Sequence, residues 1–350
     1  MLSHWTIRSG IVQKLAAARN SIAQKVSDQF FLDHPEWLVR YGERGRQFCT
    51  EDTRFHIDFL CGAMEAGSAE SFADYALWTT RMLDARGIAA HSLEENLTRI
   101  SSQLAPVLAP EECAEVFRFL DRAKLACTTE GPASELEEGG GALRLTRDVF
   151  LSAILNGQRQ AALNIVEEAL RAGHAPVDLY VDVFARALHR VGKLWELNQI
   201  SVAQEHMATA VTQYAIASIY LKLLPDSPPR GQMVVTGVSG ELHQIGANLV
   251  ADAMESKGWN VRFLGTNMPL PAIVQTIRDS SADVLCISTT LVANLPAAAQ
   301  LIRSISDDQK SAPRIVLGGA AYRHSSQFAE EFSVATVALD LRAALTLLCA

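Results

Sequence analysis

Residues 241–246 read ELHQIG and directly follow an apolar run that ends at Gly240. A histidine two positions after a carboxylate can present one ring nitrogen to a metal, while the acid accepts the proton of the other nitrogen and fixes the tautomer. Polar residues in a turn between a strand and a helix can also serve only to cap the helix. The stretch therefore allows two interpretations, a metal-facing His243 backed by Glu241 or an ordinary helix cap, and the surrounding elements must decide between them.

The elements around this stretch predict a parallel sheet. Strand-like runs MVVTG, NVRFLG, DVLCIS and RIVLGG alternate with helical stretches from residue 232 to the end of the sequence. Such alternation is typical of a doubly wound sheet that helices cover on both sides. Ligands of these sheets bind beyond the carboxyl ends of the strands. Besides His243, we expect at this edge Ser288, Thr289 and Thr290 after the third strand, and Gly318 and Gly319 after the fourth.

Together these three features resemble the motifs DxHxxG, SxL or SxT, and GG of the cobalamin-binding domain family. The resemblance implies that His243 replaces the dimethylbenzimidazole of the cofactor as the lower ligand to cobalt. Gly246 takes the position of the motif glycine. Glu241 stands where the family usually has Asp, so the carboxylate is kept with one additional methylene.

The same resemblance assigns roles to the residues after the third and fourth strands. The displaced nucleotide tail would enter the sheet, where Ser288 and Thr290 can meet its base. Gly318 and Gly319 would allow close approach of the backbone.

Residues 143–224 are predicted to form a small helical bundle of four helices. We expect one helix to end at Gly192, where a glycine can adopt the left-handed conformation. Ser201 and Gln204 form a capping box that starts the next helix. The predicted apolar face of the earlier helix consists of Val177, Tyr180, Val181, Phe184 and Leu188.

Trp195 precedes the pair Glu205-His206 by a spacing written Wx9EH, in the stretch GKLWELNQISVAQEHMAT. Alone, these residues could be a core aromatic and early-helix polar residues, since Glu205 is favourable near the positive end of a helix. In this context the stretch resembles the cap of CarH-type light sensors, in which the motif surrounds the adenosyl group above the corrin. The resemblance implies that Trp195 stacks over the upper ligand, Glu205 hydrogen-bonds the adenosine and His206 waits near cobalt. Val202 is assigned to the same surface.

Residues 8–127 have helical periodicity throughout. Pro35 and Glu36, preceded by Asp33, predict one helix start, and Ser92 and Glu95 predict a capping box at another. The predicted core stripe of the intervening helix is Phe55, Phe59 and Met64. The run HPEWLVRYGERGRQFCTEDTRFHIDFL resembles the globin-like N-terminal domains of the RsbR/RsbRD stressosome type.

A globin-like domain joined to a cobalamin light-sensing module resembles a photocobilin, in which a bilin pigment is held beside the cobalamin. A bilin carries two propionates, for which arginines with aromatic and histidine neighbours are suitable partners. The arginines could equally belong to a solvated helix face. Cys49 could attach a bilin covalently, and a third interpretation is a haem sensor with His56 as an axial ligand. The bilin candidates are Arg40, Tyr41, Arg44, Arg54, His56 and Trp78.

Composition narrows the classes of function. The chain has 350 residues, of which 49% are hydrophobic, enough for two or three cores. A formal charge of −8 makes nucleic acid a poor direct partner. The N-terminus lacks the apolar region of a secretory signal and no run is long enough to span a membrane, so we expect a cytoplasmic protein. Six cysteines without a CxxC pair argue against a zinc site and a disulfide framework.

The sequence thus predicts a multidomain α and α/β protein. Its parts are an all-helical, globin-like domain (1–127), a linker (128–142), a four-helix-bundle cap (143–227) and a flavodoxin-like, doubly wound parallel sheet (228–350). The predicted function is a light sensor, not an enzyme, that binds adenosylcobalamin and biliverdin and signals through an oligomer or an effector protein. The alternative is a corrinoid carrier that shuttles a methyl group between methyltransferases.

Overall fold

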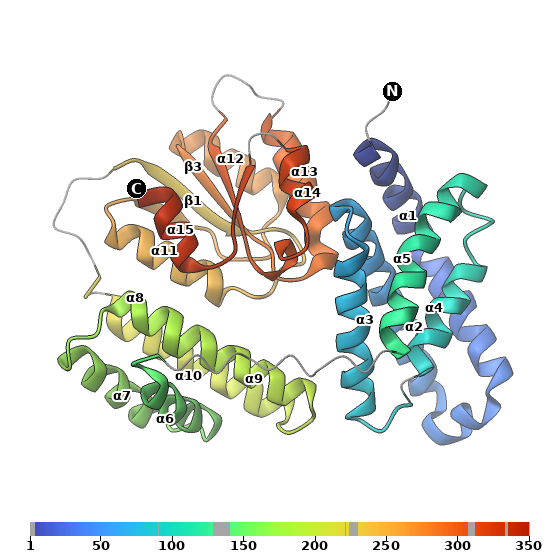
Figure 1. Ribbon diagram of the computed structural model, residues 1–350, viewed down its shortest axis with the longest axis horizontal. Coiled ribbons are helices and arrows are strands. Elements are labelled where there is room, and N and C mark those ends of the chain that lie inside the picture. The colour runs from blue at the N-terminus through green and yellow to red at the C-terminus, as the bar shows by residue number, and fades with distance from the viewer. Residues whose placement is uncertain are drawn as a thin grey trace. The chain divides into compact units, whose positions relative to one another are not determined.

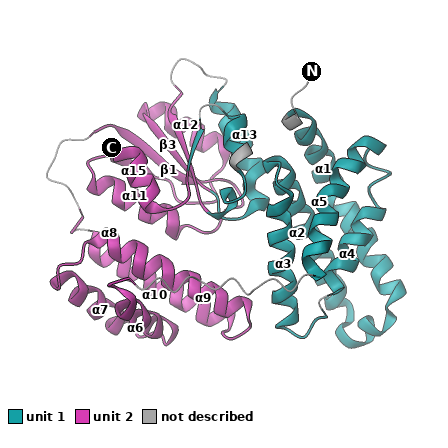
Figure 2. Cartoon of the chain, viewed as in Figure 1, with its two compact units in different colours: residues 1–131, 289–307, 320–337 teal, residues 132–288, 308–319, 338–350 magenta. Residues whose placement is uncertain are grey.

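The structure is a computed structural model that describes residues 4–89, 91–128, 141–220, 222–223, 230–306, 312–332 and 335–349. The chain forms two compact units (Figure 2). Unit 1 comprises residues 1–131, 289–307 and 320–337, and unit 2 comprises the rest. These units do not follow the predicted domain limits, because Val292 packs against the core of the N-terminal helices. Most of the predicted linker, residues 129–140, lies outside the described residues.

Unit 1 is helical in its N-terminal part, as predicted (Figure 1). Ile57, Leu60 and Met64 of the second helix lie in its core. The resemblance to a globin stays a prediction. The helices of this part are α1 (His4–Asp33), α2 (Pro35–Ala66), α3 (Ala69–Asp84), α4 (His91–Ser102) and α5 (Pro110–Thr128). The C-terminal segments of unit 1 contain η2 (Val292–Asn294), α13 (Leu295–Ser306), η3 (Ala320–Tyr322) and α14 (Ser326–Glu331).

The predicted core stripe of α2 is wrong in part. Met64 is fully buried, but Phe59 is only partly buried and Phe55 is 56% exposed. The buried face is shifted to Ile57 and Leu60. An aromatic residue can lie on the buried or on the exposed face of a helix. Hydrophobic periodicity alone therefore placed the stripe on the wrong residues.

One of the two predicted helix starts in unit 1 is correct. Pro35 opens α2, where its missing N–H costs nothing. Ser92, in contrast, lies inside α4 and its backbone N–H bonds Ala89 O at 2.9 Å, so the predicted capping box is wrong. Glu95 instead contacts His34 and Arg99.

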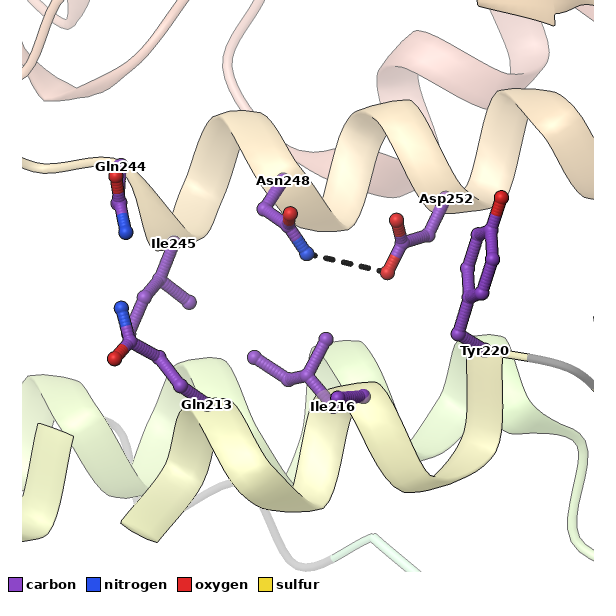
Figure 3. Close-up of a pocket in the computed structure, with 8 residues that line it drawn as sticks. Gln213, Ile216, Tyr220, Gln244, Ile245, Asn248 and Asp252 are labelled. Carbon is purple, nitrogen blue, oxygen red and sulfur yellow. Dashed lines mark hydrogen bonds between the residues drawn. The ribbon is translucent and has the colours of Figure 1, made fainter. Parts of the chain in front are cut away.

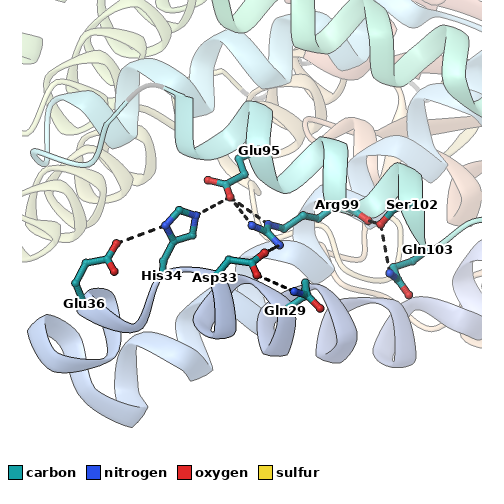
Figure 4. Close-up of polar contacts among 8 residues, drawn as sticks. All are labelled: Gln29, Asp33, His34, Glu36, Glu95, Arg99, Ser102 and Gln103. Carbon is teal, nitrogen blue, oxygen red and sulfur yellow. Dashed lines mark hydrogen bonds and ion pairs between the residues drawn. The ribbon is translucent and has the colours of Figure 1, made fainter.

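His34 lies between α1 and α2 at the centre of a charged network (Figure 4). Its Nε2 is 2.8 Å from Glu95 Oε1, and its Nδ1 is 3.4 Å from Glu36 Oε1. Arg99 pairs with Glu95 at 2.5 Å and with Asp33 at 2.7 Å. The hydrogen bond to Glu95 raises the pKa of His34 above its ordinary value of 6.5.

This network predicts a pH-dependent contribution to stability. Because folding raises the pKa of His34, its contribution is complete below pH 6.5, the ordinary value, and is lost as the pH rises through the pKa in the folded state. We expect His34→Gln, which keeps a hydrogen-bonding side chain without the charge, to flatten the fall of the unfolding midpoint above about pH 6.5. Thermal unfolding of both proteins across pH 5–9 measures it. Equal pH profiles would contradict the role of His34.

Unit 2 contains the predicted helical bundle. Gly192 lies inside a helix that continues to Glu196, so the predicted helix end there is wrong. The capping box is confirmed, since Gln204 N–H donates to Ser201 Oγ at 3.2 Å and Ser201 N–H donates to Gln204 Oε1 at 3.0 Å. The elements are α6 (Arg144–Leu155), α7 (Arg159–Arg171), α8 (Pro176–Asp178), the π-helix η1 (Leu179–Ala185), α9 (Arg186–Glu196) and α10 (Val202–Tyr220).

The sheet has the strand order β2-β1-β3-β4-β5. The pairs β1–β2, β1–β3 and β3–β4 are parallel, and the order is that of flavodoxin-like sheets, as predicted. The strands are β1 (Gln232–Gly237), β2 (Asn260–Phe263), β3 (Val284–Ser288), β4 (Arg314–Gly318) and β5 (Ala335–Ala338). Further helices of unit 2 are α11 (Ile245–Ser256), α12 (Leu270–Ser280) and α15 (Leu341–Cys349).

The bundle packs on α11 and α15 within unit 2. Leu249, Ala253 and Leu341 lie in the same apolar core as the bundle helices. Two tyrosine hydroxyls of the bundle also donate to carboxylates of α11. Tyr180 bonds Asp252 Oδ2 at 2.9 Å and Tyr220 bonds Glu255 Oε2 at 2.6 Å. Apolar packing and these polar bonds together fix the bundle on α11.

Candidate cobalamin site

The candidate site lies at the point where the strand order reverses. Strand β1 pairs with β2 on one side and with β3 on the other. Ligands of such sheets bind in the crevice where the strand order reverses. The loop after β1 carries His243. Gly237, Ser288 and Gly318 lie in one row, because the register pairs Gly237 with Ser288 and Ser288 with Gly318. The predicted gathering of these motifs at one edge is therefore observed for Ser288 and Gly318.

Glu241 and His243 form the predicted pair. His243 Nδ1 lies 2.7 Å from Glu241 Oε1, which also accepts the backbone N–H of His243 at 3.0 Å. Glu241 is fully buried, whereas the His243 side chain is 54% exposed. An ionised carboxylate can only accept, so Nδ1 carries the proton and Nε2 is left as the metal-binding nitrogen. The additional methylene of Glu relative to Asp is compatible with this contact.

The glycines of the candidate site lie in the loop after β1, at the start of α11 and at and after the end of β4. Gly240 has a φ of 85°, and its N–H donates to the side-chain oxygen of Asn267 at 2.9 Å. A Cβ at Gly318 would lie 3.2 Å from Ala338 O, and Gly319 has a φ of 110°. A Cβ at Gly246 would meet none of the described atoms within 4 Å, so open space adjoins the start of α11. Close backbone approach and open space suit a group that inserts here.

The upper-face candidates lie on α9 and α10 of the same unit. Trp195 is partly buried near the end of α9, and Val202 is exposed at the start of α10. His206 is 74% exposed, and its Nδ1 lies 2.7 Å from Glu205 Oε2 and 3.0 Å from Val202 O. Glu205 also accepts from Thr209 Oγ1 at 3.0 Å. Val202, Glu205 and His206 are thus brought together on the first turn of α10.

The remaining cobalamin candidate is Thr290, two residues beyond the end of β3. It is partly buried, and the neighbouring Thr289 is fully buried with its hydroxyl 3.1 Å from the Tyr322 hydroxyl. Thr289 therefore has a structural partner, whereas the assignment of Thr290 to a cofactor stays a prediction.

Sequence reasoning missed Leu242, Asn248 and Asp252. Leu242, between Glu241 and His243, is 74% exposed beside the candidate ligand. Asn248 and Asp252 lie on α11, which follows His243 in the chain, and their side chains point toward α10 (Figure 3). Polar residues at a spacing of four on a helix could have signalled a polar cavity, but the pattern alone is equally typical of a solvated face.

The bilin candidates are spread over α2 and α3. Arg40 and Arg44 lie over the rings of Tyr41 and Phe48 rather than in a shared pocket. The backbone carbonyl of Arg54 accepts from Arg19 Nε at 3.4 Å. The contacts of Arg40 and Arg44 fit surface arginines on a helix that is kinked at Gly42, whereas Arg54 is partly buried and its Nε is buried without a hydrogen-bond partner. Bilin binding by these residues stays a prediction.

His56 is buried and its Nδ1 lies 2.7 Å from the Tyr75 hydroxyl, while the ring of Tyr75 stacks on Trp78 with centroids 6.4 Å apart. Burial lowers the pKa of His56 to about 4, so this imidazole is neutral. Burial also raises the pKa of the Cys49 thiol, which disfavours the nucleophilic thiolate.

The part of the chain that the structure describes contains no group of three or more His, Cys, Asp or Glu able to hold a metal ion by itself. The described residues also include no helix that is both long and apolar enough for a membrane span.

Comparisons with known proteins match the part of the chain that contains these residues. Two models described as B12 binding domain match residues 146–220 and 231–341. Dimethylamine corrinoid protein 3 of Methanosarcina acetivorans is 22% identical over 170 residues, which cover 48% of this chain and 79% of that protein. Trimethylamine corrinoid protein 1 of the same organism is 27% identical over 177 residues, covering 48% and 80%.

A solved structure of the monomethylamine corrinoid protein of Methanosarcina barkeri has the same fold over this region. It superposes with a TM-score of 0.53 at 19% identity and covers 59% of this chain and 99% of that one. These matches, the Glu241–His243 pair and the sheet topology together support cobalamin binding by residues 146–341, the part of the chain that the two models match.

Proposed function

We propose that this chain binds a cobalamin through His243, which ligates the cobalt from below. The observation that carries the proposal is the exposed His243 held by the buried Glu241 at the switch point of the sheet. Glu241 orients the imidazole and keeps its proton on Nδ1. Ser288 and Thr290 would receive the nucleotide tail, and Gly318 and Gly319 would let it approach the backbone.

A bound cobalamin would supply a cobalt–carbon bond, which methyl transfer or light can break. The chain then acts as a binding protein rather than as an enzyme on its own. The function of the chain depends on what Trp195, Glu205 and His206 do to the group bound to the cobalt. The two candidate functions assign these residues different roles.

The first candidate is a corrinoid carrier of a methyltransferase system. The named relatives favour it over a light sensor, since they are named dimethylamine and trimethylamine corrinoid proteins and match about half of this chain. In this role the exposed surface of α10 leaves the upper face open to a methyltransferase. Such a methyltransferase would be the protein partner.

The second candidate is an adenosylcobalamin light sensor, favoured by one specific observation. Trp195 lies at the end of α9, and Glu205 and His206 lie on the first turn of α10, where Glu205 holds the His206 imidazole. Glu205 could accept a hydrogen bond from an adenosine hydroxyl, and His206 could ligate the vacated position. A biliverdin bound by residues 1–127 and an oligomer or effector that reads the change belong to this candidate.

An experiment that loads the protein in the dark with methylcobalamin or adenosylcobalamin, and then follows the reaction of each, distinguishes the two functions. A carrier is expected to donate the methyl group to a small thiol in the dark and to show no specific response with adenosylcobalamin. A sensor is expected to retain adenosylcobalamin in the dark, to lose the adenosyl group under green light, and to gain a second histidine ligand that His206→Ala removes. Absorption spectra follow both reactions, and failure to bind either cobalamin would contradict the proposal.

A further inference from the structure

A cavity of about 520 Å³ lies between α10 and α11 within unit 2 (Figure 3). Gln244, an exposed residue of its lining, directly follows His243. Ile216 and Ile245 form apolar parts of its wall. The other lining residues are Gln213, Ala217, Tyr220, Asn248 and Asp252, so the lining contains one acidic and no basic side chain.

Asp252 is the buried acceptor of this cavity. The residue is only 8% exposed. Tyr180 Oη donates to Oδ2 at 2.9 Å, and Asn248 Nδ2 donates to the same oxygen at 3.2 Å. Among the residues that the structure describes, no donor bonds the other oxygen, Oδ1. Oδ1 can therefore accept an N–H or O–H from a ligand or from water in the cavity that Asp252 lines.

Two exposed glutamines of the lining, Gln213 and Gln244, add hydrogen-bond donors to this acceptor. Gln213 and Gln244 carry amide groups that can both donate and accept, and neither has a side-chain hydrogen bond within the described part of the chain. A ligand that suits the whole lining therefore offers N–H groups to Asp252 and a carbonyl to the glutamines. A primary carboxamide has both functions in one group.

We infer that this cavity receives a primary carboxamide arm at the edge of the corrin ring. The inference rests on the proposed function, because cobalamin carries such arms and the cavity opens one residue after its candidate ligand. The volume leaves room for an arm together with part of the ring that bears it. Burial raises the pKa of Asp252, and its hydrogen bonds with Tyr180 and Asn248 oppose that rise.

The test compares two corrinoids that both lack the nucleotide tail. Cobinamide carries amide arms, and the methyl-ester analogue of cobyrinic acid carries ester arms of similar size without N–H donors. We expect the wild-type chain to bind the amide form more tightly. Asp252→Asn, which replaces an acceptor by an amide, is expected to reduce that preference about tenfold or more.

Glu255→Gln is the matched control. Glu255 lies on the same helix and accepts from Tyr220, as Asp252 accepts from Tyr180, but it does not line the cavity. This variant should keep the wild-type preference. Spectral titration gives both affinities, and thermal unfolding of the free protein shows whether each variant folds. If Asp252→Asn does not fold, Asn248→Ala replaces it, with the same expected loss of preference.

The outcomes separate the two proposals. Equal binding of amide and ester by the wild type, or a preference that Asp252→Asn and Asn248→Ala leave unchanged, would overturn the cavity inference while cobalamin binding stands. Failure of the wild type to bind cobalamin and cobinamide would overturn both.

Discussion

His243→Ala should weaken cobalamin binding by well over tenfold and leave the fold intact. The fold survives because His243 lies in a loop at the sheet edge with its side chain 54% exposed. The affinity falls because the variant loses the metal–nitrogen bond itself. Loss of a residue that merely orients a metal ligand already costs roughly 10–100-fold. Titration followed by the absorption spectrum measures the affinity and the change of the lower ligand together.

Two variants control this experiment. His174→Ala removes a histidine of the same unit from the turn after α7 and should bind cobalamin as the wild type does. Glu241→Gln keeps the size of the buried side chain but weakens its hold on Nδ1, so its loss of affinity should lie between those of the two alanine variants. An unchanged affinity and spectrum in His243→Ala would refute the lower-ligand assignment.

Gly62→Ala should destabilise unit 1 strongly. Gly62 is buried on α2, and a Cβ there would overlap the carbonyl group of Val292 in η2 and lie 3.0 Å from Ala293 Cα. Backbone atoms cannot move aside as the end of a flexible side chain can, so α2 and η2 must separate. Overpacking of this kind costs about 1–3 kcal/mol, and more where the backbone is held. Urea unfolding of the free protein measures the loss.

Gly10→Ala is the control for this variant. Gly10 lies on α1 of the same unit, and a Cβ there would meet no described atom within 4 Å. Alanine is the better helix former by about 1 kcal/mol, so this variant should be as stable as the wild type or more stable. If Gly62→Ala unfolded at the wild-type urea concentration, the close packing of α2 on η2 would be wrong.

The sequence predicted those parts of the site whose residues are close together in the chain, and those that the order of parallel strands brings to one edge of the sheet. Glu241 and His243 are two residues apart, so their contact follows from one turn of chain. Ser288 and Gly318 are distant in sequence, but parallel strands bring their carboxyl ends to one edge. Their gathering could therefore be predicted once the alternation of strands and helices was recognised.

The features that sequence patterns missed depend on packing. The segment Leu179–Ala185 is a π-helix, which the helical spacing of its apolar residues did not predict, although Tyr180 and Phe184 are buried as expected. Phe55 has the residue type of a core position yet is exposed. The cavity beside Asp252 exists only because α10 and α11 lie together, and no single segment encodes it.

The central claim, that a protein histidine ligates the cobalt, is tested most directly by electron paramagnetic resonance of bound cob(II)alamin. The protein is prepared with histidine labelled with the heavy isotope of nitrogen, whose different nuclear spin changes the splitting that an axial nitrogen gives. We predict doublet splittings in the labelled protein and triplets in the unlabelled one, because His243 Nε2 replaces the dimethylbenzimidazole nitrogen. Triplets in both proteins would show that the cofactor keeps its own base and would contradict the account.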